Sequence, residues 1–133
     1  MDLLINNVGN YVPQDVTALT PAVWDATLGA NLSGAYYCCH HALRLMPDGG
    51  QIINISTVAA RIPLPYFTAY ASPKYAMTAM SDILRMELRA DNIKVLLVFL
   101  GRVRTNFTAN AYKGPGTKAL GGKMGGISVE RAA

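Results

Sequence analysis

The stretch from residue 52 to residue 74 constrains this chain more than any other. It opens on an isoleucine-rich run that is typical of a buried strand and ends in two hydroxyl side chains, Ser56 and Thr57. Thirteen residues after Thr57 comes Tyr70, and four residues after that comes Lys74. A helix that opens near Tyr70 would place its phenol and the Lys74 ammonium group on one face.

This spacing favours acid–base chemistry. An unperturbed tyrosine has a pKa of about 10, and a cation nearby favours the phenolate form. We therefore expect Tyr70 to exchange a proton near neutral pH, with a hydroxyl holding a carbonyl oxygen beside it. Strand alternation sends Ser56 and Thr57 to opposite sides, so one of them faces the substrate. The spacing to Tyr70 favours Thr57, and Ser56 stays the alternative.

Two further apolar runs resemble buried strands. Leu3–Ile5 leads into Asn-Asn-Val-Gly at residues 6–9, and Val95–Leu100 leads into Gly-Arg-Val-Arg-Thr at residues 101–105. Helical patterns lie between the runs, the first opening at Thr20-Pro21 and the second running from about Tyr70 to Ala90. Strands alternating with helices predict an α/β fold, with a parallel sheet of about three strands and right-handed crossovers.

These motifs, in this order, resemble the short-chain dehydrogenase/reductase family. The family has Asn-Asn-Ala-Gly where this chain has Asn-Asn-Val-Gly, and Tyr-x-x-x-Lys matches Tyr70 and Lys74. The family's Pro-Gly-x-Val-x-Thr matches from Gly101 onwards, although Leu100 replaces the proline. The resemblance implies a partial Rossmann-like, doubly wound sheet with helices mainly on one face.

The resemblance also implies the roles of the site residues. Tyr70 would exchange the proton, Lys74 would lower its pKa, and Asn31 would hold a water that links the lysine to solvent. The implied catalytic set is Tyr70, Lys74, Thr57, Ser56 and Asn31. The reaction would be NAD- or NADP-dependent interconversion of a small-molecule alcohol and a ketone. In the family the first motif's asparagine, Asn7, stabilises the sheet, and the backbone of Gly9 lies against the cofactor's adenosine half. The implied cofactor-binding set is Asn7, Gly9, Tyr70, Lys74, Gly101, Val103 and Thr105.

The family's first half, with its glycine-rich turn for the pyrophosphate, has no counterpart in residues 1–133. The chain therefore resembles the central three strand–helix units of a longer protein. We expect it to bind no dinucleotide tightly when alone, and to be inactive and a poor monomer. Two alternatives stay open: a non-catalytic module that dimerises through its two long helices, and an incomplete gene product.

Composition and charge argue against several other classes of protein. The chain has 133 residues and a net charge of +4, and half of its 12 Lys and Arg residues follow Gly101. This basic segment is too sparse for a nucleic-acid surface, and no apolar run reaches the ~20 residues of a membrane helix. Cys38 and Cys39 are adjacent, which suits neither a metal site nor a disulfide framework. We expect a cytoplasmic protein of one domain, with a flexible substrate-loop tail at residues 106–133.

Overall fold

Three parallel strands form one sheet in a computed structural model that describes residues 1–102, 106, 111, 114 and 117. The strands are β1 (Leu3–Asn6), β2 (Gln51–Thr57) and β3 (Lys94–Leu100), and they lie side by side in this order. In register, Ile52 of β2 pairs with Leu4 on one side and Val95 on the other. The expected parallel sheet is therefore confirmed.

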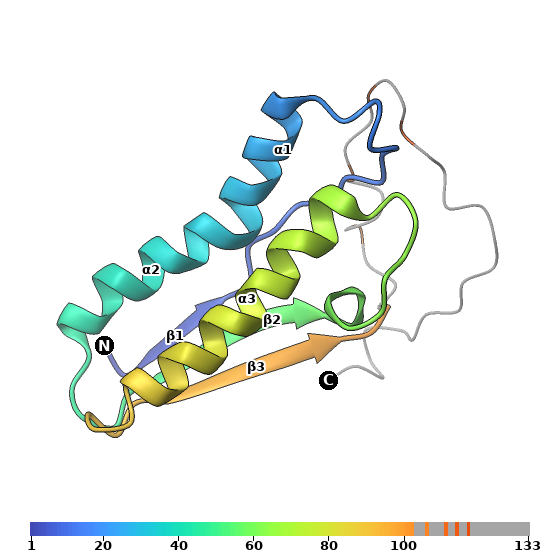
Figure 1. The fold of residues 1–133 in the computed structure, drawn as a ribbon. Coiled ribbons are helices and arrows are strands. Elements are labelled where there is room, and N and C mark those ends of the chain that lie inside the picture. The colour runs from blue at the N-terminus through green and yellow to red at the C-terminus, as the bar shows by residue number, and fades with distance from the viewer. Residues whose placement is uncertain (103–105, 107–110, 112–113, 115–116, 118–133) are drawn as a thin grey trace.

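Both crossovers lie on the same side of the sheet (Figure 1). The first runs through α1 (Pro21–Leu28), a π-helical turn (Gly29–Ser33), α2 (Gly34–Ala42) and a short 3₁₀ turn (Leu43–Leu45). The Thr20 hydroxyl caps α1 by accepting from the Val23 backbone N–H at 3.3 Å. The second crossover contains a 3₁₀ turn (Val58–Ala60) and α3 (Thr68–Glu87).

The main core lies between the sheet and these helices. Ile52 of β2 is fully buried there and packs with Cys39, Ile93 and Val95. Helix α3 buries one stripe at intervals of three and four residues: Tyr70, Lys74, Met77 and Ser81, together with Ala69 and Pro73. The catalytic candidates Tyr70 and Lys74 therefore belong to the face of α3 that contacts the sheet.

The opposite face of the sheet is open. Leu3 is 47%, Ile5 54% and Leu96 40% exposed. Large apolar side chains in a row on a sheet normally pack against a second layer. The expectation that helices cover mainly one face is confirmed.

A buried polar network ties β1, β2 and α3 together. Asn54, at the centre of β2, accepts from Asn6 Nδ2 at 2.8 Å and donates to Ser81 Oγ at 2.9 Å. The Ser81 hydroxyl in turn donates to the Met77 carbonyl at 2.7 Å. This corrects one expectation: the first motif's sheet-stabilising asparagine is Asn6, because Asn7 points out from the strand end and is exposed.

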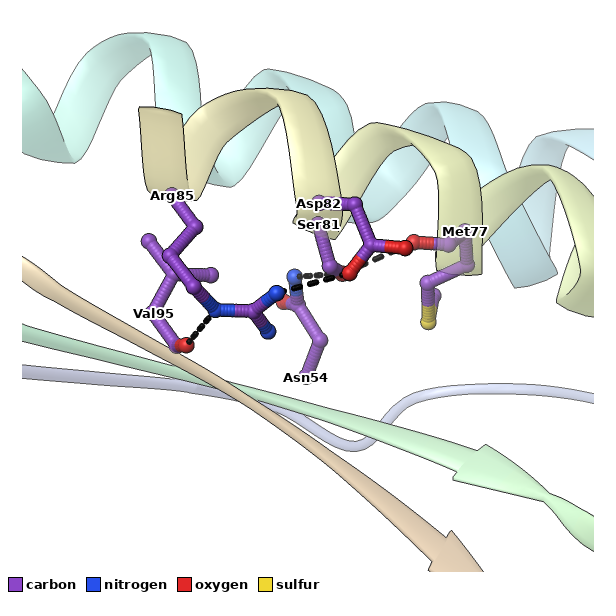
Figure 2. A network of polar contacts seen from close by, with 6 residues as sticks. All are labelled: Asn54, Met77, Ser81, Asp82, Arg85 and Val95. Carbon is purple, nitrogen blue, oxygen red and sulfur yellow. Dashed lines mark hydrogen bonds and ion pairs between the residues drawn. The ribbon is translucent and has the colours of Figure 1, made fainter. Parts of the chain in front are cut away.

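Arg85 attaches the far end of α3 to the third strand. Its Nε donates to the Val95 carbonyl at 3.0 Å, and the guanidinium also pairs with Asp82 at 2.7 Å (Figure 2). Figure 2 shows this clamp beside the contact between Asn54 and Ser81. Helix α3 is thus held to β2 near its middle and to β3 near its end.

Within the described ranges, no helix is both long and apolar enough to cross a membrane. The tail expected at residues 106–133 lies almost wholly outside the described residues.

Candidate active site

Tyr70 and Thr57 meet where β2 ends and α3 begins. Thr57 is the last residue of β2, and Tyr70 is the third residue of α3, buried against the sheet. The Thr57 hydroxyl lies close enough to the Tyr70 phenol to favour its ionised form. The Thr57 hydroxyl oxygen also accepts from the Ala59 backbone N–H at 3.3 Å, which fixes its position. The structure thus brings together the hydroxyl and the phenol that the sequence spacing selects.

Ser56 faces the other way. Its side chain is buried on the helix-facing side of β2, in the same row as Ile52 and Asn54. Its hydroxyl oxygen finds no hydrogen-bond partner among the described residues. The alternation of the strand therefore separates the two neighbouring hydroxyls, and Thr57 is the one at Tyr70.

Lys74 lies one helical turn beyond Tyr70 and is only 5% exposed. Its ammonium group donates to the Ile55 carbonyl at 3.0 Å, which ties α3 to the carboxyl end of β2. Burial lowers the pKa of Lys74, because a charged amine loses hydration inside the protein.

The pKa of Tyr70 differs from the expectation drawn from the sequence. It is raised, because burial disfavours the phenolate more than the nearby Thr57 hydroxyl favours it. In this chain Tyr70 is therefore a neutral phenol at neutral pH.

Asn31 is fully buried in the π-helical turn, and its amide orientation is fixed. The Nδ2 group donates to the backbone carbonyls of Asn10 and Thr27, each at 3.0 Å, and to Asn10 Oδ1 at 2.7 Å. A backbone carbonyl can only accept, so the amide cannot be reversed without losing these bonds. The Asn31 Oδ1 atom consequently points the other way, and it has no hydrogen-bond partner among the described residues.

Asn31 and Lys74 both approach the backbone at Gly9, where only a residue without a side chain fits. A Cβ atom at this position would lie 2.6 Å from Asn31 Oδ1 and 3.6 Å from Lys74 Nζ. The amide oxygen and the ammonium group therefore face the same small volume beside the Gly9 backbone. Sequence reasoning assigned this glycine to cofactor contact, and the structure adds that a side chain here would collide with the site itself.

Sequence reasoning missed Tyr11 and Phe67. Both rings are buried against Tyr70, and Tyr11 also belongs to an apolar cluster with Ala59. Neither residue lies in a periodic pattern, because one sits in the loop after β1 and the other just before α3. The only available signal was the apolar character of an otherwise irregular loop, Tyr-Val-Pro at residues 11–13.

The cofactor candidates lie at the carboxyl ends of the outer strands. Gly9 follows β1, and Gly101 follows β3, where a Cβ atom would meet no described residue within 4 Å. In parallel α/β sheets dinucleotides bind at this edge, so the open backbone at Gly101 fits the nicotinamide end of such a cofactor. Val103 and Thr105 lie outside the described residues. No group of three metal-ligating side chains comes together in the part of the chain that is described.

We predict that Gly9→Ala destabilises the chain by about 1–3 kcal/mol, the usual cost of overpacking. The new methyl group would meet Asn31 Oδ1 at 2.6 Å, so the loop or the π-helical turn must move. The measurement is urea unfolding followed by circular dichroism. Gly29→Ala is the matched control, because its Cβ would meet nothing within 4 Å. Equal unfolding free energies for the two variants would contradict the close approach.

Comparison with known proteins gives the same assignment. The family model described as short chain dehydrogenase matches residues 1–116. An uncharacterized oxidoreductase, YbbO of Escherichia coli, is 38% identical over 109 residues, which are 80% of this chain and 40% of the relative. D-threitol dehydrogenase of Mycolicibacterium smegmatis is 30% identical over 122 residues, which are 90% of this chain and 47% of the relative. The chain thus spans less than half the length of these curated relatives.

Solved structures agree. The angucycline C-6 ketoreductase LanV with bound NADP superposes with a TM-score of 0.77 at 28% identity, covering 80% of this chain and 41% of that protein. A dehydrogenase/reductase from Sinorhizobium meliloti superposes with a TM-score of 0.78 at 27% identity, covering 86% of this chain and 45% of that protein. With its fold, its motifs and the matched residues in agreement, this chain belongs to the short-chain dehydrogenase family.

Proposed function

We propose that this chain forms the catalytic part of an NAD- or NADP-dependent oxidoreductase that interconverts an alcohol and a ketone. The observation that carries the proposal is the position of the Thr57 hydroxyl, at the carboxyl end of β2, beside the buried phenol of Tyr70 at the start of α3. Lys74 is buried one turn beyond Tyr70 on α3, and the buried Asn31 lies with Lys74 beside Gly9. The arrangement gives one group that exchanges a proton and one that holds the substrate oxygen.

In this proposal Tyr70 donates its proton to the carbonyl oxygen when a ketone is reduced. Its raised pKa keeps the phenol protonated at neutral pH, which is the form that this direction needs. The Thr57 oxygen accepts from the Ala59 N–H, and its own hydrogen would turn from the Tyr70 phenol to the substrate oxygen when a ketone is bound. In alcohol oxidation Tyr70 must first lose its own proton, and the phenolate then accepts the proton of the alcohol.

Lys74 and Asn31 would return the proton to solvent. Their polar atoms face the same volume beside Gly9, and Asn31 Oδ1 lacks a partner among the described residues. A buried oxygen with no protein partner is a typical position for an ordered water, since water satisfies such groups. This supports a water between the amide and the ammonium group, as the family resemblance implies.

The cofactor would lie along the carboxyl edge of the sheet. At Gly9 and Gly101 the protein backbone could approach the cofactor closely, because neither residue carries a side chain. Asn7 is exposed two residues before Gly9, and Lys74 would contact the nicotinamide ribose. When bound, the nicotinamide ring supplies or accepts the hydride. LanV is described with bound NADP, and the choice between NAD and NADP for this chain stays open.

The two cysteines agree with a reducing compartment. Cys38 is exposed and Cys39 is buried, and both are free thiols. Exposed free thiols persist where glutathione and thioredoxin keep them reduced. We therefore include a cytoplasmic location in the proposal.

The hydroxyl series tests the catalytic roles. We predict that Tyr70→Phe abolishes turnover with little loss of stability, since it keeps the ring and removes only the hydroxyl that carries the exchangeable proton. Thr57→Val should lower kcat far more than Ser56→Ala, and Thr57→Ser should retain activity. The variants are made in a chimera in which this chain replaces its counterpart in D-threitol dehydrogenase, and kcat is measured with D-threitol.

Ser56→Ala is the matched control, because it removes the neighbouring hydroxyl from the opposite side of β2. More than a tenth of the activity remaining in Tyr70→Phe would overturn the proton-transfer role, since positioned acid–base groups contribute about 10²–10⁴-fold. A greater loss in Ser56→Ala than in Thr57→Val would move the substrate contact to Ser56.

We also propose that copies of this chain pair through α2 and α3. A groove of about 480 Å³ runs between these helices and is lined mainly by apolar side chains, including Leu43, Met80 and Ile83. Tyr36 at its edge is 51% exposed, and Ile83 is 54% exposed. An apolar groove flanked by an exposed aromatic ring is typical of a protein interface.

Sedimentation equilibrium tests this pairing in a chain that carries Ile5→Lys and Leu96→Lys, which should suppress association through the open sheet face. We expect dimers, and monomers after the further change Ile83→Glu, because a carboxylate would enter the groove beside Glu87. Two results would argue against this interface: a monomeric chain before Ile83→Glu is introduced, or a dimeric chain after it is introduced.

A further inference from the structure

Tyr11 lies next to the candidate catalytic residue without belonging to any recognised motif. It sits in the loop between β1 and α1, two residues after Gly9, and is 6% exposed. The loop is attached to the segment before α3, since the Gln14 backbone N–H donates to the Tyr66 carbonyl at 3.0 Å. This bond holds the Tyr11 ring over the start of α3.

Three rings contact one another at this point. The centroid of the Tyr11 ring lies 5.4 Å from that of Tyr70, and the two rings meet edge-on at an interplanar angle of 82°. The centroid of the Phe67 ring lies 5.3 Å from that of Tyr11. Phe67 completes the set, with its centroid 6.1 Å from that of Tyr70. These distances lie in the range at which aromatic rings attract one another, and an edge-on contact favours one orientation of the two rings.

We propose that Tyr11 is a positioning residue for Tyr70: its ring fixes the orientation of the catalytic phenol and keeps water from its flank. This inference rests on the proposed function of Tyr70. In this role the Tyr11 ring makes the contacts, with Phe67 on one side and Tyr70 on the other.

The charges around the two phenols agree with this role. Burial, followed by the charge of a Tyr70 phenolate, raises the pKa of Tyr11 to about 12, while Arg102 opposes this. Tyr11 therefore stays neutral wherever Tyr70 works. In the part of the chain that the structure describes, the Thr57 hydroxyl also acts on Tyr70, and Lys74 lies one turn along α3.

The proposal makes a distinctive claim about pKa. Burial is the main cause that raises the pKa of Tyr70, so removing the neighbouring ring should admit water and lower it. Tyr11→Phe keeps the ring and should leave this pKa unchanged. A residue that only filled space in the core would change stability and leave the titration of Tyr70 where it was.

The first experiment uses the 133-residue chain itself. The titration of Tyr70 is followed by carbon NMR of isotope-labelled tyrosine and assigned by its loss in Tyr70→Phe. We expect the midpoint to fall by about one pH unit in Tyr11→Ala, within the range that burial can shift. It should stay in place in Tyr11→Phe and in Ile93→Ala, a truncation in the separate core cluster around Ile52.

The second experiment measures the pH dependence of kcat in the chimera with D-threitol dehydrogenase. Tyr11→Ala should lower kcat about tenfold with the KM for the dinucleotide unchanged, and it should shift the pH profile to lower pH. Tyr11→Phe should have the kcat and the pH profile of the unsubstituted chimera. Ile93→Ala should lower the melting temperature and leave the pH profile in place.

An unchanged Tyr70 midpoint in Tyr11→Ala would overturn the positioning role, whatever the chimera does. A shifted midpoint in the chain, together with an inactive unsubstituted chimera, would support the contact and count against the proposed function. A loss of activity in Tyr11→Phe equal to that in Tyr11→Ala would also overturn the proposal, because it would assign the effect to the hydroxyl.

Discussion

The hydrogen bonds of the Asn54 side chain hold this fold in register. Asn54 lies at the centre of the middle strand, with no exposure to solvent, and its amide has one partner on β1 and one on α3. An apolar residue could occupy the same space, but it would accept many relative positions of strand and helix. A buried amide is satisfied only when Asn6 and Ser81 both lie within hydrogen-bond distance.

The catalytic candidates depend on that alignment. Ser81 and Lys74 share the buried face of α3, two turns apart, and Tyr70 lies one turn further on. On β2, Thr57 follows three residues after Asn54. Once the amide fixes the helix against the strand, Lys74 reaches the Ile55 carbonyl and Tyr70 reaches Thr57 without further adjustment. The polar network and the site are two ends of one packed interface.

The sequence predicted the parts of this arrangement that periodicity and spacing encode. The apolar strands, the Thr20 cap and the separation of Ser56 from Thr57 follow from local rules. The proximity of Thr57 to Tyr70 followed from the thirteen-residue spacing of the family that the sequence resembles. The pKa of Tyr70 did not, because it depends on burial by Tyr11 and Phe67, which come from irregular segments. The assignment of the sheet-stabilising role to Asn6 instead of Asn7 required knowing where β1 ends, and a shift of one residue reverses which side chain is buried.

The most direct test is the free energy of unfolding of Asn54→Ala, compared with Ile53→Ala on the open face of the same strand. Asn54→Ala removes a side chain and two hydrogen bonds and leaves Asn6 without its amide partner, so we predict a loss of about 2–4 kcal/mol. Ile53→Ala should cost less than half of that. A larger loss in Ile53→Ala would show that apolar packing, and not the buried amide, sets the register on which the site depends.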